Sequence, residues 1–203
     1  MTSQLKQDEC VDSLLNHKRD GYFLDIGACY PWYMNNTHYF ENERNWKGIS
    51  IEIDPKYRSD WETSRPNSIF ILADATKINY GDLLALHNAP KWIDYLSIDI
   101  EPVFASLEVL FRVFESGHTF GAISFEVDAG GDVDNRTKTK IPSRHFLLGH
   151  GYVLCCQLIV APNYHVDDVW VHNSIFNESY VRASNERLSG TLSGTLSGTP
   201  CVF

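Results

Sequence analysis

The stretch Phe23-Leu24-Asp25-Ile26-Gly27-Ala28 reads as an apolar strand that runs into a turn containing glycine. Such a strand end is typical of an open α/β sheet, in which ligands bind outside the carboxyl ends of the strands. Gly27 has no Cβ, so the backbone there can approach a ligand closely. Cys29 and Tyr30 follow in place of a second glycine, so the dinucleotide fingerprint G-x-G-x-x-G is missing. Its absence argues against a pyrophosphate cradle.

Strand-like and helix-like segments alternate after this turn, a pattern that predicts a parallel sheet with helices on both faces. Only residues 162–166 separate the last two strands, which suits an antiparallel hairpin because parallel neighbours need a longer crossover. The expected fold is a Rossmann-like, seven-stranded, mostly parallel sheet with a C-terminal antiparallel hairpin. The predicted strands are residues 22–28, 48–54, 69–74, 94–100, 121–128, 152–161 and 167–176. The predicted helices are residues 4–17, 36–45, 55–63, 81–88, 103–115 and 142–149, the fifth with a buried face of Leu107, Leu110, Phe111 and Phe114.

Length and composition favour one globular domain. We expect an N-terminal helix within residues 1–20, the domain over 21–178, and a flexible tail over 179–203 that carries three copies of LSGT. The polar N-terminus and the lack of a long apolar run predict a cytoplasmic protein that does not cross a membrane. The net charge of -9 argues against a nucleic-acid partner, because phosphate binding needs clustered cations. A small-molecule partner is expected instead.

Acidic residues end the second and third predicted strands. Glu52 lies where an ionised carboxylate can accept hydrogen bonds from two ribose hydroxyls, although a solvated strand end is the alternative interpretation. Asp54 follows it. Asp74, with Ala75, could accept from an adenine amino group, but an Asp that starts a turn would look the same. The order of strand, turn, helix, strand and acid therefore predicts a nucleoside site that begins at Asp25.

The fourth and fifth strands end in further acids, Asp99 and Glu101 on one and Glu126 and Asp128 on the other. In a regular strand, Asp99 and Glu101 would share a face. Carboxylates gathered beside a cofactor can accept a proton, hold a cationic centre or bind a divalent metal. The polar loop 129–140 is a candidate lid over the bound acceptor.

Several other residues have two interpretations each. Arg144 could bind an anionic group or form an ion pair within the fold. Trp32 and Tyr33 could stack on a ring of the ligand or belong to the core. The histidines are either bases or surface residues, because they lack metal-ligand spacing: His145, His150, His165 and His172.

Taken in order, these segments resemble the FkbM-like branch of the class I S-adenosylmethionine-dependent methyltransferases. The resemblance covers about residues 20–176 and spans strand ends and the segments between them. It rests on Asp25-Ile26-Gly27-Ala28, on Asn36-Thr37 with Phe40-Glu41, on Trp46-Lys47-Gly48 leading to Ile51-Glu52, and on Tyr95-Leu96-Ser97-Ile98-Asp99-Ile100-Glu101. One departure is Pro102, where the family usually has glycine, and it bears on where the following helix begins.

The resemblance implies S-adenosylmethionine as cofactor, with Asp25, Gly27 and Ala28 along its methionine part, Glu52 on the ribose, and Asp74 with Ala75 at the adenine. It also implies methyl transfer to a hydroxyl oxygen of a sugar or natural product. A hydroxyl acceptor loses a proton, so Asp99 or Glu126 is the expected base, and Mg²⁺ held by these acids is a further candidate. The alternative function is a catalytically inactive nucleoside-binding module on the same fold.

Overall fold

Seven strands form one sheet in a computed structural model that describes residues 2–127, 133–161 and 164–175. Their order across the sheet is β3-β2-β1-β4-β5-β7-β6. The strands are β1 (Tyr22–Ile26), β2 (Lys47–Glu52), β3 (Ser68–Leu72), β4 (Trp92–Ile98), β5 (Thr119–Glu126), β6 (Tyr152–Ala161) and β7 (Tyr164–His172).

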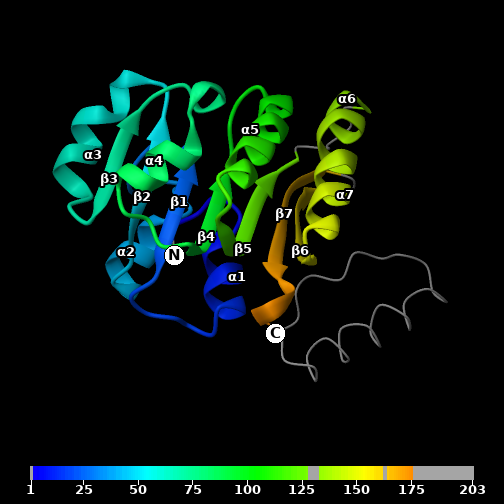
Figure 1. Ribbon diagram of the computed structural model, residues 1–203, viewed down its shortest axis with the longest axis horizontal. Coiled ribbons are helices and arrows are strands. Elements are labelled where there is room, and N and C mark those ends of the chain that lie inside the picture. The colour runs from blue at the N-terminus through cyan, green and yellow to red at the C-terminus, as the bar shows by residue number, and fades with distance from the viewer. Residues whose placement is uncertain (1, 128–132, 162–163, 176–203) are drawn as a thin grey trace.

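The first five strands are parallel, and β7 pairs antiparallel with both β5 and β6. Figure 1 shows the arrowheads of the parallel strands at one edge of the sheet, with β7 running the other way. Strand order reverses between β1 and β4, the position where open sheets of this kind bind ligands. The predicted sheet, with its terminal hairpin, is therefore confirmed.

Helices flank the sheet, and none of those described is long and apolar enough to cross a bilayer. The α-helices are α1 (Gln7–Leu14), α2 (His38–Arg44), α3 (Arg58–Ser64), α4 (Tyr80–Leu86), α5 (Val103–Glu115), α6 (Val133–Asn135) and α7 (Ile141–Gly149). Short 3₁₀ turns are η1 (Pro55–Tyr57), η2 (Ala75–Lys77) and η4 (Asn173–Ile175), and η3 (Arg136–Lys140) is a π-helix. Residues 133–140 are thus helical, so the predicted loop 129–140 is wrong over this part. Residues 128–132 and the predicted tail lie outside the described residues.

The core divides between the two faces of the sheet, because successive side chains of a strand point in opposite directions. Leu24 and Ile26 pack in one cluster with residues of α4, α5 and α7. Phe23 and Tyr95 pack in another with residues of α1 and α2. Each fully buried aliphatic or aromatic side chain contributes about 1.5–3 kcal/mol relative to an exposed one. Both faces are therefore closed by apolar contacts, and polar groups collect at the strand ends.

Helix α5 begins where expected, and most of its predicted face is confirmed: Leu110 is buried, and Leu107 and Phe114 are partly buried against the core. Pro102 is its N-cap residue, where the missing N–H of proline costs nothing because the first turn of a helix leaves such groups unpaired. Its buried residues are Val103, Ser106, Val109, Leu110 and Val113. Phe111 of the predicted face is 38% exposed and lies at the margin against α7, where its ring is 4.7 Å from that of Phe146.

Candidate cofactor and acceptor site

The bend after β1 holds the backbone of three strands together. The amides of Gly27 and Ala28 donate to the carbonyl of Ile51 at 2.9 and 3.1 Å. Gly27 has φ +85°, and a Cβ there would lie 1.7 Å from the backbone oxygen of Asp99. Glycine is thus required because the backbone at Asp99, just after β4, lies so close. The reason expected from the sequence was different, namely the close approach of a ligand. The contact also places Asp99 beside the bend.

Glu52 is buried at the same edge, and its carboxylate joins β1 to β2. One oxygen accepts from the amide of Cys29 at 2.9 Å, and the other accepts from the amides of Ile53 and Asp54, both at 2.8 Å. Only 6% of the residue is exposed, so the interpretation as a solvated strand end is wrong. A carboxylate has about four acceptor positions, so three amides leave capacity for one more donor.

Asp25 lies under the bend and is almost completely buried. It accepts hydrogen bonds from the hydroxyl of Thr37 at 2.8 Å and from the amide group of Asn35 at 3.3 Å. Burial raises its pKa to about 6, while the Thr37 hydrogen bond and the positive charge of Arg65 act in the opposite direction. Asp25 therefore contributes to the site indirectly, because its carboxylate holds Asn35 and Thr37 in place.

Asp54 and Asp74 each start a 3₁₀ turn. The carboxylate of Asp74 accepts from the amide of Thr76 at 3.0 Å and lies 2.7 Å from the Lys77 ammonium, and these bonds, Lys77 first, lower its pKa to about 2. Asp54 binds the amide and the ammonium of Lys56, and its pKa is also lowered. The structure thus matches the interpretation of Asp74 as a turn-starting residue, and its contact with adenine stays a prediction.

Asp74 nevertheless lies close to Glu52 at one edge of the sheet. The amide of Ala73 donates to the backbone oxygen of Glu52 at 2.9 Å. Ala75 is buried, and its carbonyl accepts from the Tyr80 hydroxyl at 3.0 Å. The expected gathering of acids from separate segments is therefore present in the fold.

Asp99 and Glu126 lie close together at the ends of β4 and β5, and each carboxyl group shifts the pKa of the other. Burial is the main cause that raises both pKa values, and the charge of Asp99 helps to raise that of Glu126 to about 10. Two carboxyl groups this close cannot both ionise readily, so the pair retains one proton at neutral pH. The Oε2 atom of Glu126 is buried and has no hydrogen-bond partner within the described part of the chain.

Glu101 does not share a regular strand face with Asp99, because β4 ends at Ile98 before either residue. Glu101 is exposed, and its charge contributes to the raised pKa values of Asp99 and Glu126. Asp128 lies outside the described residues. The structure thus brings three of the four predicted catalytic acids to one place.

A cavity of about 290 Å³ opens beside these acids, between the start of α5 and the helical segment α6–η3. Its lining combines an exposed aromatic ring, that of Phe104, with charged and amide groups. Asp134 and Lys138 form an ion pair across one turn of its wall, at 2.7 Å. The lining residues are Glu101, Pro102, Val103, Phe104, Asp134, Asn135 and Lys138.

No three histidine, cysteine or acidic residues among those described are arranged to hold a metal ion. The geometry therefore gives the Mg²⁺ hypothesis no support.

The structure resolves most of the remaining alternatives. Arg144 forms a two-pronged ion pair with buried Asp168, at 2.7 and 2.8 Å, so the interpretation as an ion pair within the fold is confirmed. Trp32 and Tyr33 are 43% and 60% exposed, so their placement in the core is wrong. Trp170 of β7 belongs to the core.

The histidines of the hairpin region lie away from the acids. His172 ends β7 and contacts the rings of Trp92 and Tyr152, which begin β4 and β6. Its place is therefore at the edge opposite the Gly27 bend. His145 and His150 are exposed on and after α7, and the side chain of His165 lies outside the described part.

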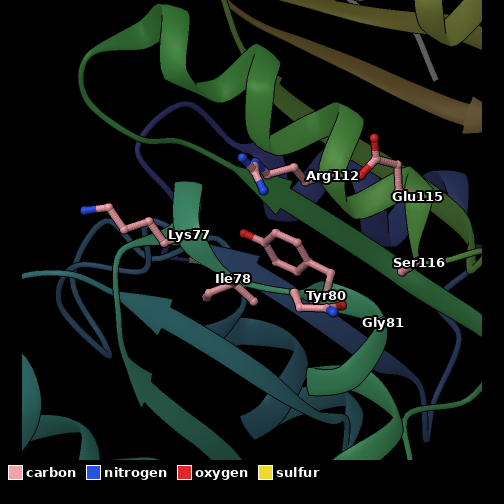
Figure 2. A pocket seen from close by; sticks show the side chains of 8 residues that line it. Lys77, Ile78, Tyr80, Gly81, Arg112, Glu115 and Ser116 are labelled. Carbon is pink, nitrogen blue, oxygen red and sulfur yellow. The ribbon is translucent and has the colours of Figure 1, made fainter.

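A second cavity, of about 400 Å³, lies between the start of α4 and the end of α5. Figure 2 shows the side chains of Tyr80 and Arg112 pointing toward one another there. The length of α5 separates this cavity from Asp99 and Glu126, which lie near the other end of the helix. The cavity adjoins the end of β3, because Lys77 lines it and also pairs with Asp74 at 2.7 Å.

Sequence reasoning missed Arg65, which follows α3 and is completely buried at its side chain. Its guanidinium pairs with Glu41 at 2.5 Å and donates to the carbonyl of Pro31 at 2.8 Å and to Asn35 at 3.1 Å. Charged side chains are almost never fully buried unless they are paired. No local pattern around Arg65 signals this role, because its partners lie 24 to 34 residues away.

The doubly wound sheet with a terminal antiparallel pair is the class I S-adenosylmethionine-dependent methyltransferase fold. Solved structures with this fold superpose on the chain at low sequence identity. TrmK of M. capricolum, solved with S-adenosylhomocysteine, has a TM-score of 0.53 and 12% identity, with 94% of this chain and 88% of that one covered. A putative O-methyltransferase of Klebsiella pneumoniae has a TM-score of 0.58 and 13% identity, with 83% and 80% covered.

A fibrillarin pre-rRNA processing protein of Methanococcus jannaschii is a third neighbour, with a TM-score of 0.51, 19% identity, and 77% of this chain and 68% of that one covered. No family model and no curated protein sequence matches the chain. At these identities the likeness establishes the fold, and the activity has to be argued from the site.

Proposed function

We propose that this chain transfers the methyl group of S-adenosylmethionine to a hydroxyl oxygen of a small-molecule acceptor, in the manner of the FkbM-like proteins that its motifs resemble. The observation that carries the proposal is the pair of acids Asp99 and Glu126, which lies beside the Gly27 bend and leaves one buried carboxyl oxygen without a described partner. A strongly perturbed acid pair at the ligand edge of such a sheet is typical of a catalytic site.

The residues around the bend suit an adenosine-containing cofactor. Glu52 has remaining acceptor capacity for ribose hydroxyls, and Asp74 lies beside it at the next strand end. The absence of the dinucleotide fingerprint disfavours a pyrophosphate, which S-adenosylmethionine lacks. We therefore assign the methionine part to Asp25, Gly27 and Ala28, and the nucleoside to the ends of β2 and β3, including Asp54 and Ala75.

When bound, S-adenosylmethionine supplies an activated methyl group on a cationic sulfur. The chain must align the acceptor oxygen with that group, exclude water and remove the hydroxyl proton. Asp99 is the proposed base: its carboxylate would take the proton of the acceptor hydroxyl. Glu126 stays protonated at neutral pH and donates to Asp99, which holds the base in one orientation.

The proposed place for the acceptor is the cavity at the start of α5. Phe104 offers an exposed apolar ring there, and Glu101 and Asn135 offer polar groups to a hydroxylated compound. The net charge of -9 disfavours RNA, although the fibrillarin neighbour is described as a pre-rRNA processing protein. A small acceptor, such as a sugar or natural product, fits both observations better.

Two measurements on the full chain test the proposal. S-adenosylhomocysteine should raise the melting temperature, because a ligand that binds only the folded state stabilises it, whereas NAD should leave the temperature unchanged. Methyl-labelled S-adenosylmethionine, incubated with a panel of hydroxylated acceptors, should then yield a labelled product. Binding without transfer to any acceptor would favour the inactive nucleoside-binding module, and stabilisation by neither cofactor would overturn the proposal.

A further inference from the structure

The segment 29–36 between β1 and α2 crosses the edge of the site without regular secondary structure. It carries two residues with positive φ, Cys29 and Met34, and several exposed aromatic side chains. Its own backbone therefore offers little to hold its shape. Long-range side chains supply the anchors instead, since Trp61 donates to the carbonyl of Cys29 at 2.8 Å and Arg65 donates to that of Pro31 at 2.8 Å.

Arg65 is well placed to hold this segment still. Its guanidinium lies over the ring of Trp61, 4.7 Å from the centroid, and its charge is matched by buried Glu41. Glu41 in turn accepts from the amide of Asn67 and the hydroxyl of Ser68. A buried arginine with a matched charge and a rigid fork of donors loses little freedom when it binds a loop.

A second path leads from Arg65 to the floor of the site. The guanidinium donates to the hydroxyl oxygen of Thr37 at 3.1 Å, and that hydroxyl donates to the carboxylate of Asp25 at 2.8 Å. The charged groups that face Asp25 are Arg65, which favours its ionised form, and Asp99, which disfavours it.

We propose that Arg65 is a positioning residue of the cofactor site, which holds the segment 29–36 directly and the Asp25 carboxylate through Thr37. The inference rests on the proposed function for the identity of the ligand. It goes beyond that function because it gives Arg65, which lines neither cavity, two roles. Arg65 holds the segment 29–36 in one conformation, and it favours the ionised form of the Asp25 carboxylate.

The test compares Arg65→Gln and Arg65→Lys with the matched control Arg58→Gln, an exposed arginine at the start of α3. The probe is S-adenosylhomocysteine, titrated calorimetrically between pH 5 and 8. We expect Arg65→Gln to weaken binding at pH 7.5 by about tenfold or more, the value of one or two lost charged hydrogen bonds. The pKa of Asp25, followed by its carboxyl ¹³C shift in the ligand-free protein, should rise above about 6 because the facing positive charge is gone.

Arg65→Lys keeps the charge but lacks the fork, so it should weaken binding while the pKa of Asp25 stays near 6. If Arg65→Gln does not fold, Thr37→Val tests the path to Asp25 alone: it should raise the pKa of Asp25 and weaken binding, and it leaves the Arg65–Glu41 pair intact. Unchanged binding and an unchanged Asp25 pKa in either variant would overturn the inference. Failure of the unaltered protein to bind S-adenosylhomocysteine would instead overturn the proposed function, and the Asp25 titration would still decide the role of Arg65.

Discussion

The acidic residues in the two halves of the sheet differ in their hydrogen-bond partners and in the direction of their pKa shifts. At the ends of β2 and β3, Glu52 and Asp74 accept hydrogen bonds from nearby backbone amides, and the pKa of Asp74 falls to about 2. At the ends of β4 and β5, Asp99 and Glu126 face one another, and the pKa of Glu126 rises to about 10. Residues that look equivalent in the sequence therefore differ in charge at neutral pH.

The two environments suit two different roles, a structural one and a catalytic one. Acids whose oxygens accept hydrogen bonds from backbone amides hold turns in place. In a buried acid pair, a carboxyl group that stays protonated can hold the other in place as a base. We infer that the β1–β3 half forms the surface that binds the cofactor and that the β4–β5 half handles the proton.

The largest effect is expected from Asp99→Asn, which removes the proposed base. The rate of methyl transfer should fall by about 10²- to 10⁴-fold, because a positioned base contributes that much. S-adenosylhomocysteine should bind as before, as measured by calorimetry. The exposed Glu62→Gln on α3 is the control and should change neither quantity. An active Asp99→Asn variant would show that Asp99 is not the base.

Glu52→Ala comes next, since it leaves three backbone amides without their acceptor. The free energy of unfolding should fall by on the order of 3 kcal/mol in urea titrations, and the thermal stabilisation by S-adenosylhomocysteine should vanish. Glu52→Gln keeps an acceptor oxygen and should recover part of the stability. Normal cofactor binding by Glu52→Ala would show that Glu52 does not contact the ribose.

Glu126→Gln should change how stability depends on pH. The folded protein holds the Glu126 proton up to about pH 10, whereas the unfolded chain releases it near its ordinary pKa of 4.5. The folded state therefore binds more protons between these values, and its stability falls as pH rises through that window. At pH 9 the variant should be more stable than the unaltered protein by about 1–3 kcal/mol. Parallel pH profiles of the two proteins would contradict the shared proton.

The smallest effect is expected from Asp74→Ala, which removes the cap of η2 and the partner of Lys77. The dissociation constant of S-adenosylhomocysteine should rise by about three- to tenfold, the value of one hydrogen bond. Asp82→Ala serves as the control: this exposed acid in the first turn of α4 accepts from the Asn79 side chain at 2.7 Å, and its loss should leave the constant unchanged. Equal effects from both variants would mean that Asp74 has no special place at the adenine.

Most of the fold could be predicted from the sequence because its signals are local. Continuous apolar runs mark buried strands, and the short link between the last two predicts their antiparallel pairing, as β6 and β7 show. The parallel strands end earlier than predicted, and β4 ends at Ile98, just before Asp99. On α5 the prediction is confirmed for Leu107, Leu110 and Phe114 and is wrong for Phe111, because apolar residues occur around most of that helix and only the packing selects among them.

The site was predictable in outline only. The acids Asp25, Glu52 and Asp99 do gather at one edge, because parallel strands end together. Which acid builds a turn and which shares a proton depends on partners distant in the chain, such as Glu126 for Asp99. The role of Arg65 could not be predicted for the same reason, since the packing of α2 and α3 brings it to partners that are distant in the chain.

The most direct single measurement is a crystal structure of the full chain with S-adenosylhomocysteine. We predict the ribose beside Glu52, the methionine part along the Gly27 bend, and the sulfur facing the Asp99–Glu126 pair. Ligand density in the cavity between Tyr80 and Arg112, with the Gly27 edge empty, would contradict the assignment of the two halves.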